Sequence, residues 1–249
     1  MRHSLCHDIR SAMTILFAAL PHALRRHLYF ASQTIEVSDA AQTRLLNSGL
    51  TLPASLNRAV LKRRVEFLSG RACAREALRL AGLTVPDSLP ISPHRHPVWP
   101  VNIVGSISHC NQLAFAVVAH RQALHSVGMD IEECMTESAL DSVRALIAKP
   151  QELRLAAQTG LAETLAGTLL FSAKESLFKA LFADVQRIFD FSCAQLTDWQ
   201  PSRQCLQLTL TQSLSPTNPL GKQLCCYYHC FDNHVLTLCL EPQRGLDPA

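Results

Sequence analysis

The chain has 249 residues, of which 48% are hydrophobic and 17% charged, and its net charge is +3. This composition excludes a disordered chain, and no basic stripe is concentrated enough to indicate a protein that binds nucleic acid. The length suits one large domain or two smaller ones that share a core.

Cysteine usage and the N-terminal segment indicate the compartment. The ten cysteines lie within apolar stretches such as LCCYYHC and LTLCL, where a free thiol behaves as a small hydrophobe. The apolar run over residues 12–20 is short, lacks a clean cleavage pattern and is soon followed by Arg25 and Arg26, so it does not predict a signal peptide. No stretch approaches the ~20 apolar residues that span a bilayer. We therefore expect a soluble, cytoplasmic protein.

The predicted elements of the first half begin with a helix over residues 56–83, where apolar residues recur at helical spacing up to Gly82. Five prolines between residues 86 and 100 then predict an extended loop. Three short apolar stretches follow, IVGSISHC, LAFAVVAH and HSVGMDIE, which we interpret as strands of one sheet.

The second half is predicted to be helical over residues 139–182, in two pieces, with Pro150 and Glu152 in the first turn of the second. Four strands then follow: FDFSCAQL, QCLQLTL, QLCCYYHCF and HVLTLCL. Helices mixed with antiparallel-type strands predict the α+β class. We place a boundary near residues 120–125, which divides the chain into lobes 1–122 and 123–249.

The segment GMDIE carries two acidic residues at strand spacing. Asp130 and Glu132 share one face of the strand, about 6–7 Å apart, while Met129 and Ile131 share the other. Two such carboxylates repel each other unless a cation lies between them, and hard oxygen ligands suit Mg²⁺. The alternative is a solvated sheet edge with two ordinary acids.

The segment FSAKESLFKA places three charged residues in an apolar helix. Glu175 and Lys179 lie one turn apart in its polar sector, so they form either a surface ion pair or part of a site. Lys174 lies at the edge of the apolar sector, near Phe171 and Phe178. Its ammonium group either snorkels to solvent or reaches a buried anion.

The segment GSISHC does not have the spacing of a nucleophile elbow, because Ile107 stands at the serine position. Ser108 and His109 at a strand end instead suit hydrogen bonds to phosphate, with a structural histidine as the alternative. The ligand-type residues of CCYYHC lack a second, separated half-site, so we interpret that segment as a strand rather than a zinc site.

Basic residues cluster in KRRVEFLSGR. Arg64 directly follows Lys62 and Arg63. Arg71 lies seven residues after Arg64, two helical turns along the same face. Guanidinium groups in this arrangement bind phosphate well, and a solvated helix face is the alternative.

The order of these segments resembles the three signature motifs of the 4′-phosphopantetheinyl transferases. GSISHC is followed by VGMDIE and, about forty residues later, by FSAKESLFKA. The stretches KRRVEFLSGRACAREAL and HRHPVWP further resemble the enterobactin-synthase component D branch of the surfactin-type group. The resemblance covers residues 56–182 closely and the C-terminal strands loosely.

The resemblance implies two pseudo-symmetric α+β lobes with the active site between them. It implies transfer of the phosphopantetheine arm of coenzyme A to a serine of an apo acyl or peptidyl carrier protein, with Mg²⁺ as cofactor and adenosine 3′,5′-bisphosphate as product. Such a reaction belongs to siderophore, polyketide or nonribosomal-peptide biosynthesis. We expect a monomer that binds neither nucleic acid nor membrane.

The resemblance also assigns roles to residues. The implied metal ligands are Asp130, Glu132 and Glu175, and the implied catalytic residues are Glu175, as base directly or through water, and Lys179. The implied coenzyme A-binding residues are Arg63, Arg64, Arg71, Arg95, Ser108, His109, Lys174 and Lys179.

Two other functions fit the same residues. A metal-dependent phosphohydrolase would use the carboxylates on a phosphate ester without any carrier protein. A non-catalytic module would bind coenzyme A or a carrier protein, but it would have no physical need for the complete set of acidic residues.

Overall fold

A computed structural model describes residues 2–84 and 89–243, with side chains from residue 11 onward. The elements of its first half are α1 (Arg2–Ala19), α2 (His22–Arg25), β1 (Leu28–Thr34), α3 (Asp39–Asn47), η1 (Ala54–Leu56), α4 (Leu61–Leu80), β2 (Ile103–His109) and β3 (Leu113–His120). Those of its second half are β4 (Leu124–Glu133), α5 (Glu137–Ile147), α6 (Pro150–Gln158), α7 (Glu163–Val185), η2 (Phe191–Cys193), β5 (Ala194–Gln200), η3 (Pro201–Arg203), β6 (Cys205–Leu210), β7 (Gln223–Phe231) and β8 (His234–Pro242). The predicted α+β class is confirmed.

The strands form two antiparallel sheets. Three strands pair in the order β1-β3-β2, and five pair in the order β4-β8-β7-β6-β5. The prediction that β2, β3 and β4 belong to one sheet is therefore wrong for β4, because its backbone partner is β8, more than a hundred residues away along the chain. Local alternation identifies a strand but carries no information about its distant partner.

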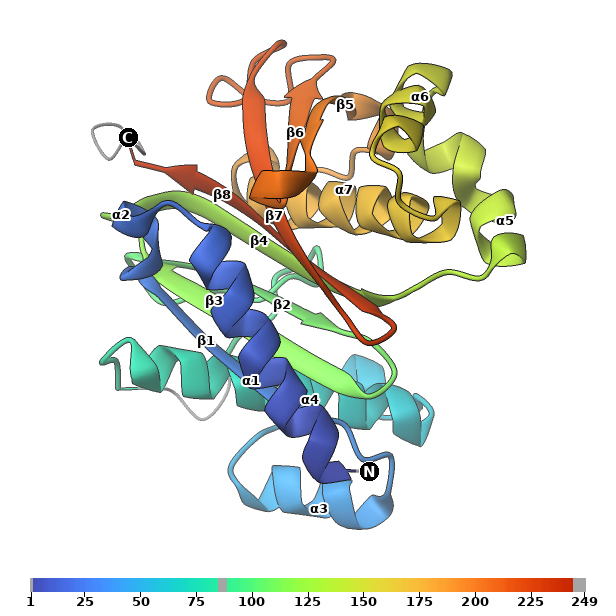
Figure 1. The fold of residues 1–249 in the computed structure, drawn as a ribbon. Helices are drawn as coiled ribbons and strands as arrows, with labels where there is room; N and C mark the ends of the chain where they lie inside the picture. The colour runs from blue at the N-terminus through green and yellow to red at the C-terminus, as the bar shows by residue number, and fades with distance from the viewer. Residues whose placement is uncertain (1, 85–88, 244–249) are drawn as a thin grey trace.

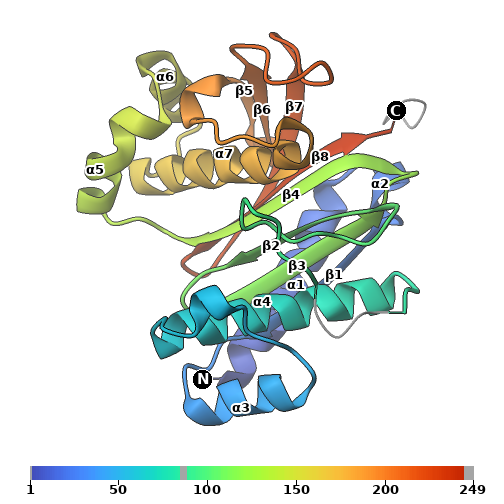
Figure 2. The ribbon, with the colours of Figure 1, turned by 180° about the vertical axis from the view of Figure 1, so that it is seen from behind.

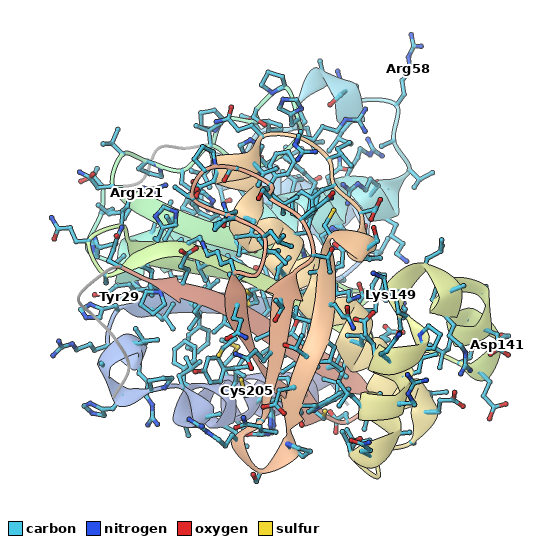
Figure 3. The ribbon with its side chains drawn as sticks, turned by 90° about the horizontal axis from the view of Figure 1, so that it is seen from above. Tyr29, Arg58, Arg121, Asp141, Lys149 and Cys205 are labelled. Atoms are coloured by element: carbon cyan, nitrogen blue, oxygen red, sulfur yellow. The ribbon has the colours of Figure 1, made fainter. Side chains whose placement is uncertain are left out.

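The two sheets together form the middle layer of the molecule. Helix α1 packs on one face, against β1 and β7, whereas α4 and α7 cover the opposite face (Figures 1 and 2). Strand β3 is buried on both sides: Phe115 and Val117 contribute to the cluster that includes α1, whereas Ala116 and Val118 contribute to the cluster under α4. In the view from above, Asp141 of α5 and Lys149 before α6 lie on the side of the molecule opposite Arg121 (Figure 3).

The helices after β4 differ in number from the prediction. Three helices occupy residues 137–185, where two pieces were expected. Pro150 is the first residue of α6, and Glu152 accepts a hydrogen bond from the Lys149 backbone N–H, so the predicted start of that helix is confirmed. Among the helices of the described residues, none combines the length and apolar character required to cross a membrane.

Candidate active site

The two sheets meet along a seam, defined here as the line where β2 lies beside β4. Serine side chains form its hydrogen bonds in place of a backbone ladder. Ser106 Oγ accepts from the Met129 backbone N–H at 3.0 Å, and Ser108 Oγ accepts from that of Ile131 at 3.3 Å. The alternation of GSISHC, which directs both serines to the same side of β2, therefore joins the two sheets.

Helix α7 crosses β4 next to the seam, and Gly128 makes this close approach possible. A Cβ atom at residue 128 would collide with the backbone oxygen of Ser176 and the backbone nitrogen of Ala180. The absence of a side chain thus brings the α7 backbone close to β4, two residues before Asp130.

Asp130 is the most fully bonded carboxylate at the seam. It is 3% exposed, with Oδ1 accepting from Ser108 Oγ at 2.8 Å and from Lys179 Nζ at 2.7 Å. Its Oδ2 accepts from Ser172 Oγ at 2.8 Å. The interpretation of Asp130 as a solvated edge residue is therefore wrong, because β2 and α7 enclose it.

Glu132 and Glu175 lie near Asp130 and carry raised pKa values. Burial, with the neighbouring charges of Asp130 and Glu175 in support and that of Lys179 in opposition, raises the pKa of Glu132 to about 7. Burial also raises the pKa of Glu175, while Lys179 opposes the shift and Asp130 adds to it. The three carboxylates thus repel one another across a site that Lys179 only partly neutralises.

His109 lies at the end of β2 between two groups from α4. Its Nε2 is 2.9 Å from Arg63 Nη1, and its Nδ1 is 4.0 Å from a carboxylate oxygen of Glu66. Burial lowers the pKa of His109, the Glu66 charge opposes the shift and the Arg63 charge adds to it. A hollow of about 200 Å³ brings His109 and Glu66 together with Glu132.

Arg64 and Arg71 hold unpaired donors within the protein. Arg64 Nε and Arg71 Nη1 are buried and have no hydrogen-bond partner, although the Arg71 guanidinium lies 5.0 Å from the centre of the Phe67 ring. Arg71 is 6% exposed, and burial lowers its pKa to about 10. A buried guanidinium with an unpaired donor is a site that an anion stabilises.

A cavity of about 900 Å³ lies at the other end of the seam from the hollow beside His109, against the first residues of β2 and β4. The segment 93–107 lines it together with part of α7, and both Arg95 and Lys179 reach it. Arg95 is exposed and adopts a left-handed backbone conformation with a φ of 66°. Lys179 therefore contacts the Asp130 carboxylate and also lines a space large enough for a cofactor-sized ligand.

Lys174 does not join this site. Its ammonium group is 2.7 Å from Glu152 Oε1, and the two side chains are 2% and 1% exposed. Glu152 also accepts the backbone N–H of Leu196 at 2.8 Å. Of the two alternatives for Lys174, solvent and a buried anion, the structure shows the second: the anion is the Glu152 carboxylate rather than the coenzyme A phosphate that the resemblance implies.

Two residues of the site were not among the predicted site residues. Ser172 bonds to Asp130, and Glu66 faces His109 and the basic residues Lys62 and Arg63. Each had a signal in the sequence: Ser172 lies in the polar sector of α7, and Glu66 lies three residues after Arg63. Their roles depend on neighbours from other elements, which spacing alone does not identify.

Comparisons with known proteins identify the family of the chain. Residues 52–119 match the family model of the 4′-phosphopantetheinyl transferase N-terminal domain, and residues 126–239 match that of the 4′-phosphopantetheinyl transferase superfamily. Enterobactin synthase component D of Escherichia coli strain K12 is 40% identical over 146 residues, which are 59% of this chain and 67% of the relative.

Two further relatives come from other bacteria. Enterobactin synthase component D of Salmonella typhi is 37% identical over 154 residues, 61% of this chain and 62% of the relative. The 4′-phosphopantetheinyl transferase PptT of Mycobacterium tuberculosis is 37% identical over 142 residues, 56% of this chain and 60% of the relative. The chain belongs to the 4′-phosphopantetheinyl transferase family and is an enzyme of that class.

Proposed function

We propose that this enzyme transfers the 4′-phosphopantetheine arm of coenzyme A to a serine of an apo acyl or peptidyl carrier protein. Adenosine 3′,5′-bisphosphate is the other product, and the reaction requires Mg²⁺. The observation that carries the proposal is the convergence of Asp130, Glu132, Glu175 and Lys179. Lys179 lines a cavity of about 900 Å³, and Glu132 lines a hollow of about 200 Å³. The names of the relatives support a carrier of siderophore biosynthesis.

Asp130, Glu132 and Glu175 are the proposed ligands of Mg²⁺. The donor set fits this ion, which prefers carboxylate oxygens. Burial first and the neighbouring carboxylates second raise the pKa of Glu132 to about 7, and a bound cation offsets both effects. When bound, Mg²⁺ neutralises charge on the pyrophosphate oxygens.

The side chains around the ion perform the remaining tasks. Glu175 accepts the hydroxyl proton of the carrier serine. At the same time the serine oxygen forms a bond to the phosphorus that carries the pantetheine arm. The bond from that phosphorus to the bridging oxygen of the pyrophosphate breaks, and the electron pair leaves with adenosine 3′,5′-bisphosphate. Lys179, which already reaches both Asp130 and the cavity, donates hydrogen bonds to the pyrophosphate and stabilises its developing charge.

The basic residues bind the other phosphates of coenzyme A in this proposal. The buried unpaired donors of Arg64 and Arg71 support an anion at α4. His109 in the hollow, with Arg63 beside it, and Arg95 in the cavity supply further donors. The Ser108 hydroxyl orients Asp130 and Lys179 through hydrogen bonds, and this is its main role in the proposal. Lys174 is left out, because Glu152 already binds its ammonium group.

The lobes 1–122 and 123–249 are part of the same proposal. The boundary falls in the turn between β3 and β4. The three-stranded sheet is formed entirely by residues before it and the five-stranded sheet by residues after it, and the two sheets contact each other along the seam. We also propose that the enzyme is a monomer in the cytoplasm. Size-exclusion chromatography with light scattering tests the oligomeric state, and fractionation of the producing cells tests the location.

Intact-mass spectrometry of an apo carrier protein tests the reaction. With coenzyme A and Mg²⁺, the carrier gains the mass of one phosphopantetheine arm, and a chelator in excess of Mg²⁺ prevents the gain. The variant Asp130→Asn abolishes the gain, whereas Asp141→Asn on the exposed side of α5 preserves it.

Two outcomes would favour the other functions. Binding of coenzyme A without any mass gain on several classes of carrier would indicate a binding module. Release of adenosine 3′,5′-bisphosphate from coenzyme A in water, at the same rate with and without carrier, would indicate a phosphohydrolase.

A further inference from the structure

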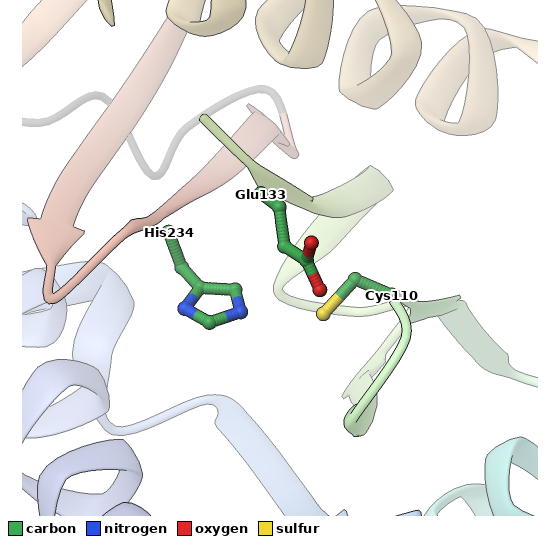
Figure 4. A group of neighbouring side chains, drawn as sticks. All are labelled: Cys110, Glu133 and His234. Atoms are coloured by element: carbon green, nitrogen blue, oxygen red, sulfur yellow. The ribbon is translucent and has the colours of Figure 1, made fainter. Parts of the chain in front are cut away.

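Three metal-binding side chains converge at the end of the seam, next to the proposed carboxylate site, where two of them line the same hollow as Glu132. They are Cys110, which directly follows β2, Glu133, the last residue of β4, and His234, the first residue of β8 (Figure 4). One ligand atom from each, a thiol sulfur, a carboxylate oxygen and an imidazole nitrogen, lies within 4.8 Å of the other two.

The sheet register explains this convergence. Glu133 pairs directly with His234 in the antiparallel β4–β8 ladder, so both side chains lie on the same face of the sheet. Glu132 is the preceding residue and points to the opposite face, where Asp130 and Glu175 lie. Cys110 is held in place by its backbone N–H, which donates to Leu113 O at 2.9 Å in the β2–β3 turn.

His234 provides an independent sign of a missing ligand. The residue is 8% exposed, and neither Nδ1 nor Nε2 has a hydrogen-bond partner. Its ring stacks on Phe231, with the centroids 5.5 Å apart, which orients the imidazole but satisfies neither nitrogen. Burial of two unpaired polar atoms is costly, and a metal ion bound to one of them removes part of that cost.

We propose that Cys110, Glu133 and His234 bind Zn²⁺. A thiolate, an imidazole and a carboxylate are its usual protein ligands, and the sulfur and nitrogen donors disfavour Mg²⁺. Bond lengths of about 2.0–2.3 Å in a tetrahedral site separate ligand atoms by roughly 3.3–3.8 Å, so side-chain movements of about 1 Å complete the site. Water occupies the fourth position.

The zinc site cross-links the two sheets. Cys110 belongs to the β2–β3 hairpin, whereas Glu133 and His234 belong to the five-stranded sheet. Zn²⁺ thus joins the sheets beyond the last serine contact of the seam, Ser108 with Ile131. Because the ion binds the folded chain and not the separated strands, it raises the thermal midpoint of unfolding.

Cobalt substitution tests the site on the full chain. Metal-free protein in excess Mg²⁺, which saturates the carboxylate site, is titrated with Co²⁺ and followed by absorption spectroscopy. We expect a thiolate-to-cobalt charge-transfer band that saturates at one equivalent and disappears when Zn²⁺ is added. The band identifies this site because the ligand set of Asp130, Glu132 and Glu175 contains no sulfur.

Matched variants separate this site from the other thiols. Cys110→Ser abolishes the charge-transfer band, and Glu133→Gln and His234→Ala each weaken Co²⁺ binding at least tenfold. Cys134→Ser, whose side chain packs in the core cluster on the α7 side, preserves the band, as does Asp130→Asn. Circular dichroism shows which metal-free variants fold. If His234→Ala does not fold, Glu133→Gln tests the site in its place, because Glu133 is only half-buried and its substitution disturbs the core less.

Any of three results would overturn the proposal. They are no thiolate band in the unaltered chain, a band that persists in Cys110→Ser, and an affinity of Glu133→Gln for Co²⁺ equal to that of the unaltered chain. All three are independent of transferase activity, so the proposed reaction and the proposed zinc site fail or succeed separately.

Discussion

Ser108 connects three groups of the proposed active site through one hydroxyl. It donates to Asp130 Oδ1 at 2.8 Å and accepts from Lys179 Nζ at 2.9 Å and from the Ile131 backbone N–H at 3.3 Å. Ser106, two residues earlier, bonds only to the backbone of Met129. The two serines therefore form a matched pair in which only one contacts charged side chains.

We predict that Ser108→Ala lowers kcat/KM about tenfold and weakens the apparent affinity for Mg²⁺, because Asp130 loses a charge-assisted hydrogen bond worth about 1.5 kcal/mol. Ser106→Ala lowers stability instead and leaves the Mg²⁺ dependence unchanged. Initial rates at varied Mg²⁺, with urea unfolding of both variants, make the comparison. Equal Mg²⁺ dependence in the two variants would argue against the role of Ser108.

The raised pKa of Glu132 predicts how pH affects Mg²⁺ binding. Burial and the nearby carboxylates shift this pKa from its ordinary value to about 7, so Glu132 is mostly protonated at pH 6 and mostly ionised at pH 8. Protons therefore compete with Mg²⁺ below about pH 7. We expect the affinity for Mg²⁺ to rise as pH increases from 6 to 7 and to level off towards 8.

Isothermal titration with Mg²⁺ across this pH range measures the effect. In Glu132→Gln the affinity is lower, and its rise between pH 6 and 8 is lost. An affinity independent of pH in the unaltered chain would contradict a pKa of about 7 for Glu132 at the site.

Helix α7 illustrates what happens at the scale of an element. Its polar sector, including Ser172, Ser176 and Lys179, lies against β4 and β8, while its apolar sector packs into the core of the second half of the chain. The helix is thus enclosed on both sides, and a lysine on its apolar side has no route to solvent. Lys174 meets this constraint through its ion pair with Glu152.

We predict that Lys174→Met lowers the free energy of unfolding by about 3–5 kcal/mol, because it leaves the Glu152 carboxylate buried without its cation. The double variant Lys174→Met with Glu152→Gln recovers part of this loss, since the amide still accepts the Leu196 N–H. Lys179→Met abolishes transfer with a smaller effect on stability.

Urea unfolding and the KM for coenzyme A are the two measurements for Lys174. A large rise in that KM with unchanged stability would restore Lys174 to the phosphate site that its sequence position indicates.

At the scale of the whole molecule, α1 connects the two halves of the core. Met13, Leu16 and Leu20 are at most 1% exposed and share one cluster with Phe115 and Val117 of the first sheet and with Met129 and Leu238 of the second. The first fifty residues carry no recognisable motif, yet the structure gives α1 this central position.

We predict that Leu16→Ala lowers the free energy of unfolding of the whole chain by about 2–5 kcal/mol, because it opens a cavity in the shared core. Ile15→Ala, at a neighbouring position that is 43% exposed, changes it by less than about 0.5 kcal/mol. Urea denaturation followed by fluorescence and by circular dichroism measures both. A loss confined to one probe would show that α1 stabilises only one half.

Much of the site could be predicted because it depends on local periodicity. The period of two in GMDIE places Asp130 and Glu132 on one face of β4, and the helical spacing of FSAKESLFKA places Glu175 and Lys179 in one sector. The structure agrees with both placements and brings the two segments together. The roles of these residues in metal binding and catalysis stay predictions.

The sequence by itself determined the α+β class, the approximate positions of the strands and of helix α4 in the chain after residue 56, and the residues that share a face, because these depend on neighbours a few positions away. The tertiary structure alone decided which distant groups meet: β4 with β8 rather than β2, Lys174 with Glu152, and Cys110 with Glu133 and His234. Such partners follow from packing over the whole chain, and local spacing specifies the direction of a side chain but not what lies in front of it.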